Sequence, residues 1–280
     1  MPELPEVETV RRGLTELVAG SRIKTVDVLY PKMINLSSSD FAHALQNQTI
    51  DGIDRRGKYL FIRIGNGLTI VSHLRMEGKY DVEPEGVPLS KHTHIVFHLA
   101  DGRQLRYNDT RKFGRMNLVT TGQEMTVAGL KTIGPEPTEE TLTLDYMRRI
   151  FGKSRKLIKP FLLDQSNIAG LGNIYADEVL WLSKIHPKQP VNTLSVTELK
   201  ELRQNIIEEI KRAIAGHGTT VHSYSTAYGE AGSFQNNLNV YGREGQPCLR
   251  CGTPIEKIKL AQRGTHFCPT CQVIHGDRHG

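Results

Sequence analysis

The cysteines constrain this chain more than any other feature of its sequence. The chain has four of them, in two Cys-x-x-Cys pairs, Cys248–Cys251 and Cys268–Cys271, separated by residues 252–267. Each pair can form a tight turn that presents two thiolates, and two pairs at this spacing are typical of a tetrahedral zinc site in a reducing compartment. Because four protein ligands close the site, we expect one structural Zn²⁺ and no catalytic metal.

The segment between the cysteine pairs predicts a β-hairpin. Residues Ile255–Ala261 and Thr265–Phe267 have strand character, and we expect Arg263-Gly264 at the tip of the hairpin. At a tip, Arg263 is either a solvated turn residue or a cation presented to a phosphate or a minor groove. The pattern alone leaves both interpretations open.

Short strands dominate the N-terminal part of the chain, over residues 22–120. Residues Tyr59–Val71 predict a hairpin around Gly65-Asn66-Gly67, and His94–Tyr107 predict a second one around Asp101-Gly102. Several short strands at this spacing indicate a sandwich or a barrel-like sheet.

After a linker over residues 134–138 the apolar period becomes helical. The candidate helices are Leu144–Phe151, Lys156–Leu163, Ile174–Ser183 and Val196–Ala215. The sequence thus predicts an α+β, multidomain protein. Its expected parts are an N-terminal β-sandwich domain with a leading helix (1–133), a helical domain (139–240) with a long loop (217–239), a zinc finger (241–272) and a tail (273–280).

The first residues of the chain predict a nucleophilic amine at the N-terminus. An initiator Met before a small residue is normally trimmed, so we expect the mature chain to begin at Pro2 with a free secondary amine. An α-amino group has a pKa of about 8 and is far more often neutral at pH 7 than lysine is, so it can attack an electrophilic carbon. Glu3 places a carboxyl beside it for proton transfer. The alternative is a capped amphipathic helix without chemistry, because Val7 and Leu14 recur at helical spacing.

A glycine-rich turn joins two of the predicted helices. Gly170 and Gly172 allow backbone amides to approach an anion closely, and Asn173 follows at a helix N-terminus, which favours phosphate. The alternative is an ordinary helix–loop–helix.

The overall charge favours an anionic partner. The net charge is +6 and the isoelectric point about 9.1, which points first to nucleic acid. No stretch approaches the roughly 20 apolar residues of a membrane span, and the acidic N-terminus is no secretory signal. We therefore expect a cytoplasmic protein without membrane contact.

Together, the opening Pro2–Glu8, the Gly170–Tyr175 turn and the four-cysteine finger resemble the bacterial formamidopyrimidine-DNA glycosylases, also called 8-oxoguanine DNA glycosylases. The resemblance covers residues 1–272. It implies a helix-two-turn-helix in the helical domain. It also implies a monomeric, nucleoid-associated repair enzyme that acts on damaged double-stranded DNA. Such an enzyme removes an oxidised purine and cleaves the abasic strand by β- and δ-elimination.

The resemblance also implies roles for single residues. Pro2 is the nucleophile at C1′ of the sugar and Glu3 the proton donor, while Lys58 and Arg263 act in β- and δ-elimination. The implied DNA contacts are His73, His92, Arg111, Asn173 and Tyr241. The side chains implied to fill the space left by the flipped base are Met76, Arg111 and Phe113, of which Arg111 would pair with the orphaned cytosine. Without the resemblance, Met76 and Phe113 would be assigned to the sheet core, Lys58 to a solvated strand face and His73 to a turn.

Three further assignments accompany the resemblance. Glu6 is a partner of the helix dipole and also steers the Pro2 amine, Glu77 lies near the base pocket, and the 217–239 loop closes over the flipped base. The loop residues concerned are Thr219, Thr220, Ser223 and Tyr224. The alternative for this loop is disorder.

Two other functions remain open. The endonuclease VIII family has the same architecture, but typically has Gly where this chain has Leu4, and it prefers oxidised pyrimidines. A non-enzymatic zinc-finger DNA-binding protein would explain the charge and the finger, but it gives no reason for the Pro2-Glu3 start.

Overall fold

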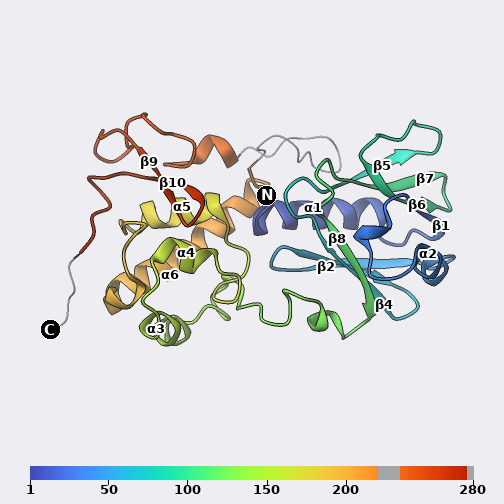
Figure 1. Ribbon diagram of the computed structural model, residues 1–280, viewed down its shortest axis with the longest axis horizontal. Coiled ribbons are helices and arrows are strands. Elements are labelled where there is room, and N and C mark those ends of the chain that lie inside the picture. The colour runs from blue at the N-terminus through green and yellow to red at the C-terminus, as the bar shows by residue number, and fades with distance from the viewer. Residues whose placement is uncertain (220–233, 276–280) are drawn as a thin grey trace. The chain divides into compact units, whose positions relative to one another are not determined.

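The computed structural model describes residues 1–219 and 234–275. These residues form two compact units (Figure 1). The first contains residues 1–132 and the segment that starts at His217, and the second contains residues 133–216 and the segment that starts at Phe234.

The first unit is a β-sandwich with a leading helix, as predicted. Its two four-stranded sheets have the orders β1-β6-β7-β5 and β2-β3-β4-β8, and every strand pair is antiparallel. The strands are β1 (Ile23–Val28), β2 (Ile50–Arg56), β3 (Tyr59–Ile64), β4 (Leu68–His73), β5 (Lys79–Pro84), β6 (Thr93–Leu99), β7 (Arg103–Asn108) and β8 (Arg115–Thr120). The helical segments of this unit are α1 (Leu4–Val18), η1 (Pro31–Met33), α2 (Ser38–Leu45) and η2 (Glu124–Thr126).

Both predicted hairpins are confirmed. Strands β3 and β4 pair from Tyr59↔His73 to Ile64↔Leu68, and β6 and β7 pair up to His98↔Gln104. Alternating side chains from both sheets enter one apolar core, which includes Ile62 and Phe97. Helix α1 packs against β2 and β3 and adds Val7 and Leu14 to that core (Figure 1). The sandwich therefore holds the N-terminal residues on a rigid element.

The second unit contains four α-helices in its described part. They are α3 (Leu144–Gly152), α4 (Ile158–Leu163), α5 (Asn173–Leu182) and α6 (Val196–Ala215), with short turns η3 (Val191–Thr193) and η4 (Phe234–Asn237). Helix α6 spans the predicted residues. It begins with a capping box between Ser195 and Glu198 and ends at Gly216, and it buries Leu202 and Ile206 at helical spacing. The turn before α5 includes Gly170, whose φ of 94° favours glycine.

The finger hairpin also belongs to the second unit. It consists of β9 (Glu256–Leu260) and β10 (Arg263–Phe267), which pair antiparallel from Arg263↔Leu260. The predicted tip at Arg263-Gly264 is wrong, because these residues begin β10. The tip is Ala261-Gln262, with φ of 47° and 62°. A two-residue hairpin turn requires such positive φ values, which Asn-Gly usually supplies. Ala-Gln carries no such signal, so the nearby glycine suggested the wrong position.

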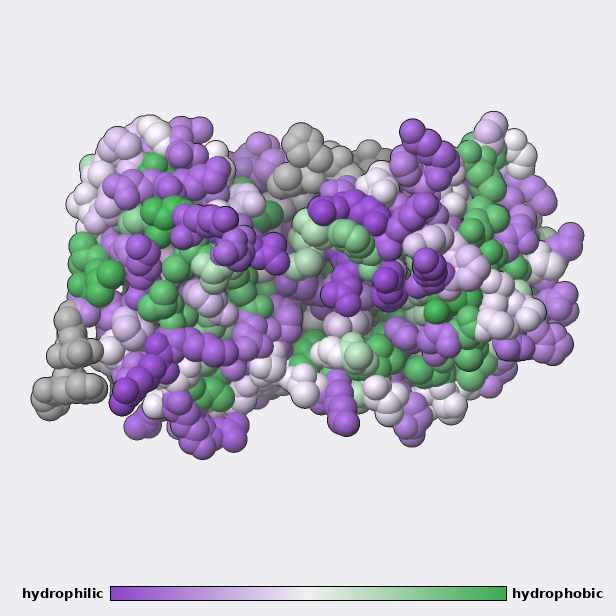
Figure 2. Space-filling view, viewed as in Figure 1, coloured by the Kyte–Doolittle hydropathy of each residue, from purple (hydrophilic) through white to green (hydrophobic). Residues whose placement is uncertain are grey.

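Hydrophilic residues cover most of the face shown in Figure 2, and hydrophobic residues there form separate groups. Among the described residues, no helix combines the length and the apolar character needed to cross a membrane.

Candidate active site and nucleic-acid interface

The first residues are fixed by the start of α1. Pro2 is buried and Glu3 is 2% exposed. Glu3 is the N-cap of α1, and its backbone N–H donates to Glu6 Oε2 at 2.8 Å, as part of a capping box. Pro5 is tolerated in this first turn because the turn has unpaired N–H groups in any case. The predicted nucleophile and proton donor therefore lie on a backbone with one defined conformation.

Glu6 also binds the segment that follows α6. Its Oε1 accepts the backbone N–H of Thr219 at 2.8 Å and the Thr219 hydroxyl at 3.1 Å. A Cβ on Gly218 would lie 2.7 Å from the same oxygen, and Gly218 has a φ of 73°, so this position requires glycine. Glu6 thus joins the predicted catalytic residues to the start of the predicted lesion loop. Thr220, Ser223 and Tyr224 of that loop lie outside the described residues.

Lys58 and His73 lie close to each other at one end of the second sheet. Lys58 is 4% exposed, on the turn between β2 and β3, and His73 ends β4. Both side chains are buried, whereas residue type alone would assign Lys58 to a solvated strand face and His73 to a turn. The backbone N–H of Arg75 donates to His73 Nδ1 at 2.9 Å, and Tyr59 packs edge-on against the imidazole. Burial, and then the nearby Arg75 and Lys58, lower the pKa of His73 to about 3. Because neutral His73 accepts at Nδ1, its proton is on Nε2, where it can donate to a phosphate.

The lowered pKa of His73 predicts that the free energy of unfolding falls in acid. In the unfolded chain the pKa of His73 is 6.5, whereas the fold lowers it to about 3. As the pH falls below 6.5 the unfolded state binds the proton first, so stability present above that pH is progressively lost. We expect His73 to reduce the free energy of unfolding by up to ~1.4 kcal/mol per pH unit. His73→Gln should flatten this slope in urea unfolding between about pH 6.5 and 4.5. The control His43→Gln, at an exposed site of α2, should not. Equal slopes for His73→Gln and wild type would contradict this.

Met76, Arg111 and Phe113 are brought together by two loops. The guanidinium of Arg111 lies 3.1 Å from Met76 Sδ through NH1 and 4.9 Å from the centre of the Phe113 ring. Phe113 is 48% exposed and Met76 is partly exposed. The assignment of these two residues to the sheet core is therefore wrong for this fold. His92 is partly exposed, just before β6.

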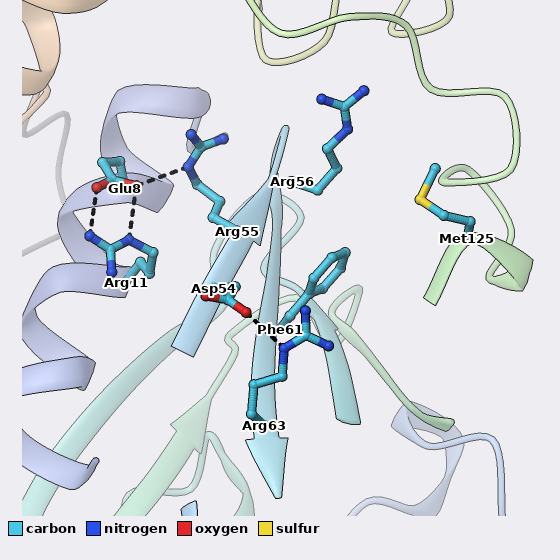
Figure 3. Close-up of a pocket in the computed structure, with 8 residues that line it drawn as sticks. All are labelled: Glu8, Arg11, Asp54, Arg55, Arg56, Phe61, Arg63 and Met125. Atoms are coloured by element: carbon cyan, nitrogen blue, oxygen red, sulfur yellow. Dashed lines mark hydrogen bonds and ion pairs between the residues drawn. The ribbon is translucent and has the colours of Figure 1, made fainter. Parts of the chain in front are cut away.

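A cluster of arginines that the sequence analysis did not identify surrounds Glu8. Arg11, Arg12 and Arg55 all donate to the Glu8 carboxylate at 2.8–3.0 Å (Figure 3 shows Arg11 and Arg55). Burial by itself would raise the pKa of Glu8. The hydrogen bonds from the three arginines outweigh this effect and bring the pKa down to about 2. Glu8, Arg11 and Arg55 of this cluster line an open hollow of about 480 Å³ with Asp54, Arg56, Phe61, Arg63 and Met125. Of the predicted site residues that the structure describes, none lines this hollow.

In the second unit, two donors hold the backbone carbonyl of Gly264, next to Arg263. Asn173, the first residue of α5, donates to it through Nδ2 at 3.0 Å. Lys159 Nζ donates to the same carbonyl at 2.9 Å and pairs with Asp177 at 2.6 Å, fully buried. Arg263 itself is exposed. The predicted phosphate contact Asn173 and the predicted elimination residue Arg263 are therefore adjacent. Lys159 and Asp177 carried no local sequence signal, because an ion pair depends on the folded chain.

Tyr241 is positioned by a buried carboxylate. Glu178 on α5 accepts the backbone N–H groups of Asn239, Val240 and Tyr241 at 2.7–2.9 Å. Burial raises the pKa of Glu178, although these N–H groups oppose the rise. The ring of Tyr241 packs against His266, 4.9 Å between centres. Glu178 thus fixes the chain where it enters the finger.

The four cysteine thiols form one cluster, with all Sγ atoms within 4.8 Å of one another. Cys251 Sγ lies 3.5 Å from Cys268 Sγ and 3.5 Å from Cys271 Sγ. A tetrahedron with Zn–S bonds of about 2.3 Å has edges of about 3.8 Å, so the cluster fits one zinc ion. Trp181 Nε1 donates a hydrogen bond to Cys248 Sγ at 3.4 Å. A residue that does not itself bind the metal thus helps to orient one of its ligands.

Three family models match the chain. The model described as the formamidopyrimidine-DNA glycosylase N-terminal domain matches residues 1–116. The H2TH domain of the same glycosylases matches residues 133–225, and a zinc finger found in FPG and IleRS matches residues 245–273. The match of the finger and the geometry of the thiols together show a structural zinc site.

Similar proteins cover nearly the whole chain. The formamidopyrimidine-DNA glycosylase of Lactiplantibacillus plantarum is 69% identical over 96% of this chain and 98% of that protein. That of Pediococcus pentosaceus is 61% identical over 98% of this chain and 100% of that protein. A solved structure of the Lactococcus lactis enzyme in complex with DNA containing an abasic site is 47% identical. It matches with a TM-score of 0.92 over 96% of this chain and 99% of that one. This chain therefore belongs to the formamidopyrimidine-DNA glycosylase family.

Proposed function

We propose that this protein excises oxidised purines, namely 8-oxoguanine and formamidopyrimidines, from duplex DNA and cleaves the resulting abasic strand. The observation that carries the proposal is the buried Pro2-Glu3 segment, held by the capping box of Glu3 and Glu6. A mutant of the Lactococcus lactis relative, 47% identical to this chain, has been solved with DNA containing a Fapy-dG lesion, which supports this substrate class.

The chemistry begins with removal of Met1, which leaves Pro2 with a secondary amine. The positive end of α1 disfavours an ammonium close by and helps to keep this amine neutral. The nitrogen lone pair of Pro2 attacks C1′ as the bond to the base breaks. The electrons of that bond leave with the base, which takes up the proton that the Pro2 nitrogen loses. Glu3 protonates the ring oxygen as its bond to C1′ breaks, so that the nitrogen lone pair can form the C=N bond. The product is a cationic iminium at Pro2.

The iminium then acts as an electron sink. It acidifies the C2′ proton, and loss of this proton expels the 3′-phosphate (β-elimination). A second elimination expels the 5′-phosphate (δ-elimination). We assign Lys58 to proton transfer in the first elimination, and Arg263 to the second and to phosphate binding. The zinc ion supports the fold of the finger and takes no part in these steps.

Base flipping requires filling of the vacated space, because unstacking costs a few kcal/mol. Met76 and Phe113 wedge between bases, and Arg111 pairs with the orphaned cytosine. His73, His92, Asn173 and Tyr241 position the duplex through contacts that carry no sequence information, so binding should weaken steeply with salt. Glu77 lies near the base pocket, and the 217–239 loop closes over the flipped base.

This proposal gives each part of the chain a task. Residues 1–133 form the catalytic domain, residues 139–240 and the finger (241–272) bind DNA, and residues 134–138 link them. One chain supplies both sets of contacts, so we propose that it acts as a monomer. Because its substrate is the chromosome and its thiolates require a reducing compartment, we place it at the nucleoid in the cytoplasm.

A comparison of two lesions tests the substrate class. We expect cleavage of an 8-oxoguanine·cytosine duplex to exceed cleavage of a thymine glycol duplex at least roughly tenfold in kcat/KM, because a polar base pocket rejects a base that leaves its groups unpaired. An undamaged duplex is the control. The reverse preference would indicate endonuclease VIII-like specificity, and binding without cleavage of either lesion would indicate a non-enzymatic DNA-binding protein.

A further inference from the structure

The side chains that we propose to fill the DNA stack lie on two loops of the sandwich. Met76 lies in the turn from Leu74 to Gly78, which is closed by a hydrogen bond from Gly78 N to Leu74 O at 3.0 Å. Arg111 and Phe113 lie in the loop from Asp109 to Gly114. The contacts of Arg111 with Met76 and Phe113 join the two loops at their exposed tips.

Beneath the second loop, one buried residue binds both of its ends. Asp109 is 1% exposed. Its Oδ1 accepts the backbone N–H of Arg111 at 2.9 Å, and its Oδ2 accepts that of Gly114 at 2.8 Å. Between them, Lys112 adopts a φ of 60°, which is unfavourable for a residue with a Cβ. The carboxylate thus stabilises a loop conformation that the local sequence would not favour.

The backbone of Asp109 is fixed as well. Its N–H donates to the carbonyl of His92 at 3.0 Å. His94 Nε2 donates to its carbonyl at 2.7 Å, because a carbonyl oxygen can only accept. The position of the carboxylate is therefore set by strand β6 and by the residue just before it.

Tyr107 connects the two loops below their tips. It is fully buried, and its Oη lies against a glycine of each loop. A Cβ on Gly78 would lie 2.0 Å from this oxygen, and one on Gly114 would lie 1.7 Å from it. Only glycine permits such close approach. The two loops therefore pack on one rigid side chain and cannot shift independently.

We propose that Asp109 is a positioning residue for the reading of the orphaned base: it holds Arg111 and Phe113 in their working geometry before DNA binds, and Tyr107 aligns Met76 with them. The inference rests on the proposed function. Asp109 touches none of the reacting atoms and acts through the loop. Its contribution is preorganisation, because a loop that is already ordered loses less entropy when it enters the duplex.

Asp109→Asn tests this inference. The asparagine amide offers one acceptor oxygen, and its NH₂ would face the second N–H, so one end of the loop is released. We expect kcat/KM for 8-oxoguanine opposite cytosine to fall roughly tenfold. The ratio of kcat/KM opposite cytosine to that opposite adenine should fall towards one. Cleavage of a preformed abasic site in single-stranded DNA should stay within about twofold of wild type, because that substrate has no orphaned base and no stack to fill.

The matched control is Asp101→Asn. Asp101 Oδ1 accepts the N–H of Arg103 at 3.1 Å, the same two-residue motif with an arginine, in the exposed turn between β6 and β7. This variant should keep the wild-type ratio. A folded Asp109→Asn protein with the wild-type cytosine-to-adenine ratio would overturn the inference. A uniform loss of activity on every substrate, the single-stranded abasic site included, would overturn it too.

A second variant covers the case in which Asp109→Asn does not fold. Tyr107→Phe keeps the ring and removes only the oxygen between the two glycines, so it should lower the same ratio by a smaller factor. An unchanged ratio in this variant would then count against the inference. Failure of wild type itself to cleave damaged DNA would refute the proposed function instead, so the two failures are distinguishable.

Discussion

Replacing Pro2 with glycine is expected to lower strand cleavage at 8-oxoguanine by at least roughly a hundredfold while DNA binding is largely retained. The substitution exchanges the secondary amine for a primary one and removes the ring that holds the nitrogen at the start of α1. The measurement is borohydride trapping on a duplex with one 8-oxoguanine opposite cytosine, with mass mapping of the adduct. For wild type, the adduct should map to Pro2, which would also establish removal of Met1.

The control for this exchange is Pro88→Gly, in an exposed loop of the same unit, which should cleave like wild type. A second control retains Met1, so that the Pro2 nitrogen is an amide and no adduct can form at Pro2. Full cleavage by Pro2→Gly would refute the assignment. DNA binding without any adduct, in a preparation shown to start at Pro2, would favour a binding protein without catalysis.

Loss of the zinc ion should have the second large effect. Cys268 is fully buried and packs with Trp181, Val240 and Ile255 in the small core of the finger. The binding of a structural zinc ion typically contributes about 10–16 kcal/mol to folding. We therefore expect that this small core does not keep the finger folded without the metal. Cys268→Ser should bind less than stoichiometric zinc and lose at least tenfold in DNA affinity, since Arg263 and Tyr241 are no longer held.

Trp181 offers a direct readout of this loss. It is the only tryptophan of the chain, its indole N–H donates to Cys248 Sγ, and Arg250 lies 3.7 Å from its ring centre. Its fluorescence should therefore change when zinc is removed from wild type by a chelator, and return when zinc is added. The control Thr270→Ser, between the ligands, should keep zinc and affinity. A zinc-free Cys268→Ser protein with wild-type DNA affinity would contradict the prediction.

Features with a local physical cause could be predicted. Helix α6 was predicted residue for residue, because its capping box, apolar period and terminal glycine all lie within one segment. The hairpin of β3 and β4 followed from Gly65-Asn66-Gly67, and the zinc ligands from spacing alone. The tip of the finger was misplaced, because Ala261-Gln262 adopts positive φ without a residue type that signals it.

Contacts between distant segments could not be predicted. Lys159 and Glu178 are charged residues that would usually be exposed, and each is buried by partners far along the chain. Lys159 donates to the carbonyl of Gly264, which lies 105 residues later in the chain. Glu178 accepts the N–H of Asn239, which lies 61 residues later. Which partner a buried charge finds depends on strand register and helix packing, and the local pattern contains neither.

The amino-acid sequence by itself thus determined the elements, the metal ligands and the candidate nucleophile, because periodicity, capping and ligand spacing act over a few residues. Tertiary structure alone decided how the site is held. Glu6 accepts hydrogen bonds from Thr219, Asp109 accepts the N–H of Arg111, and Tyr107 packs between Gly78 and Gly114. The physical reason is that a buried polar group is tolerated only when the folded chain supplies its partners, and those partners are brought close only when the sheets and helices pack.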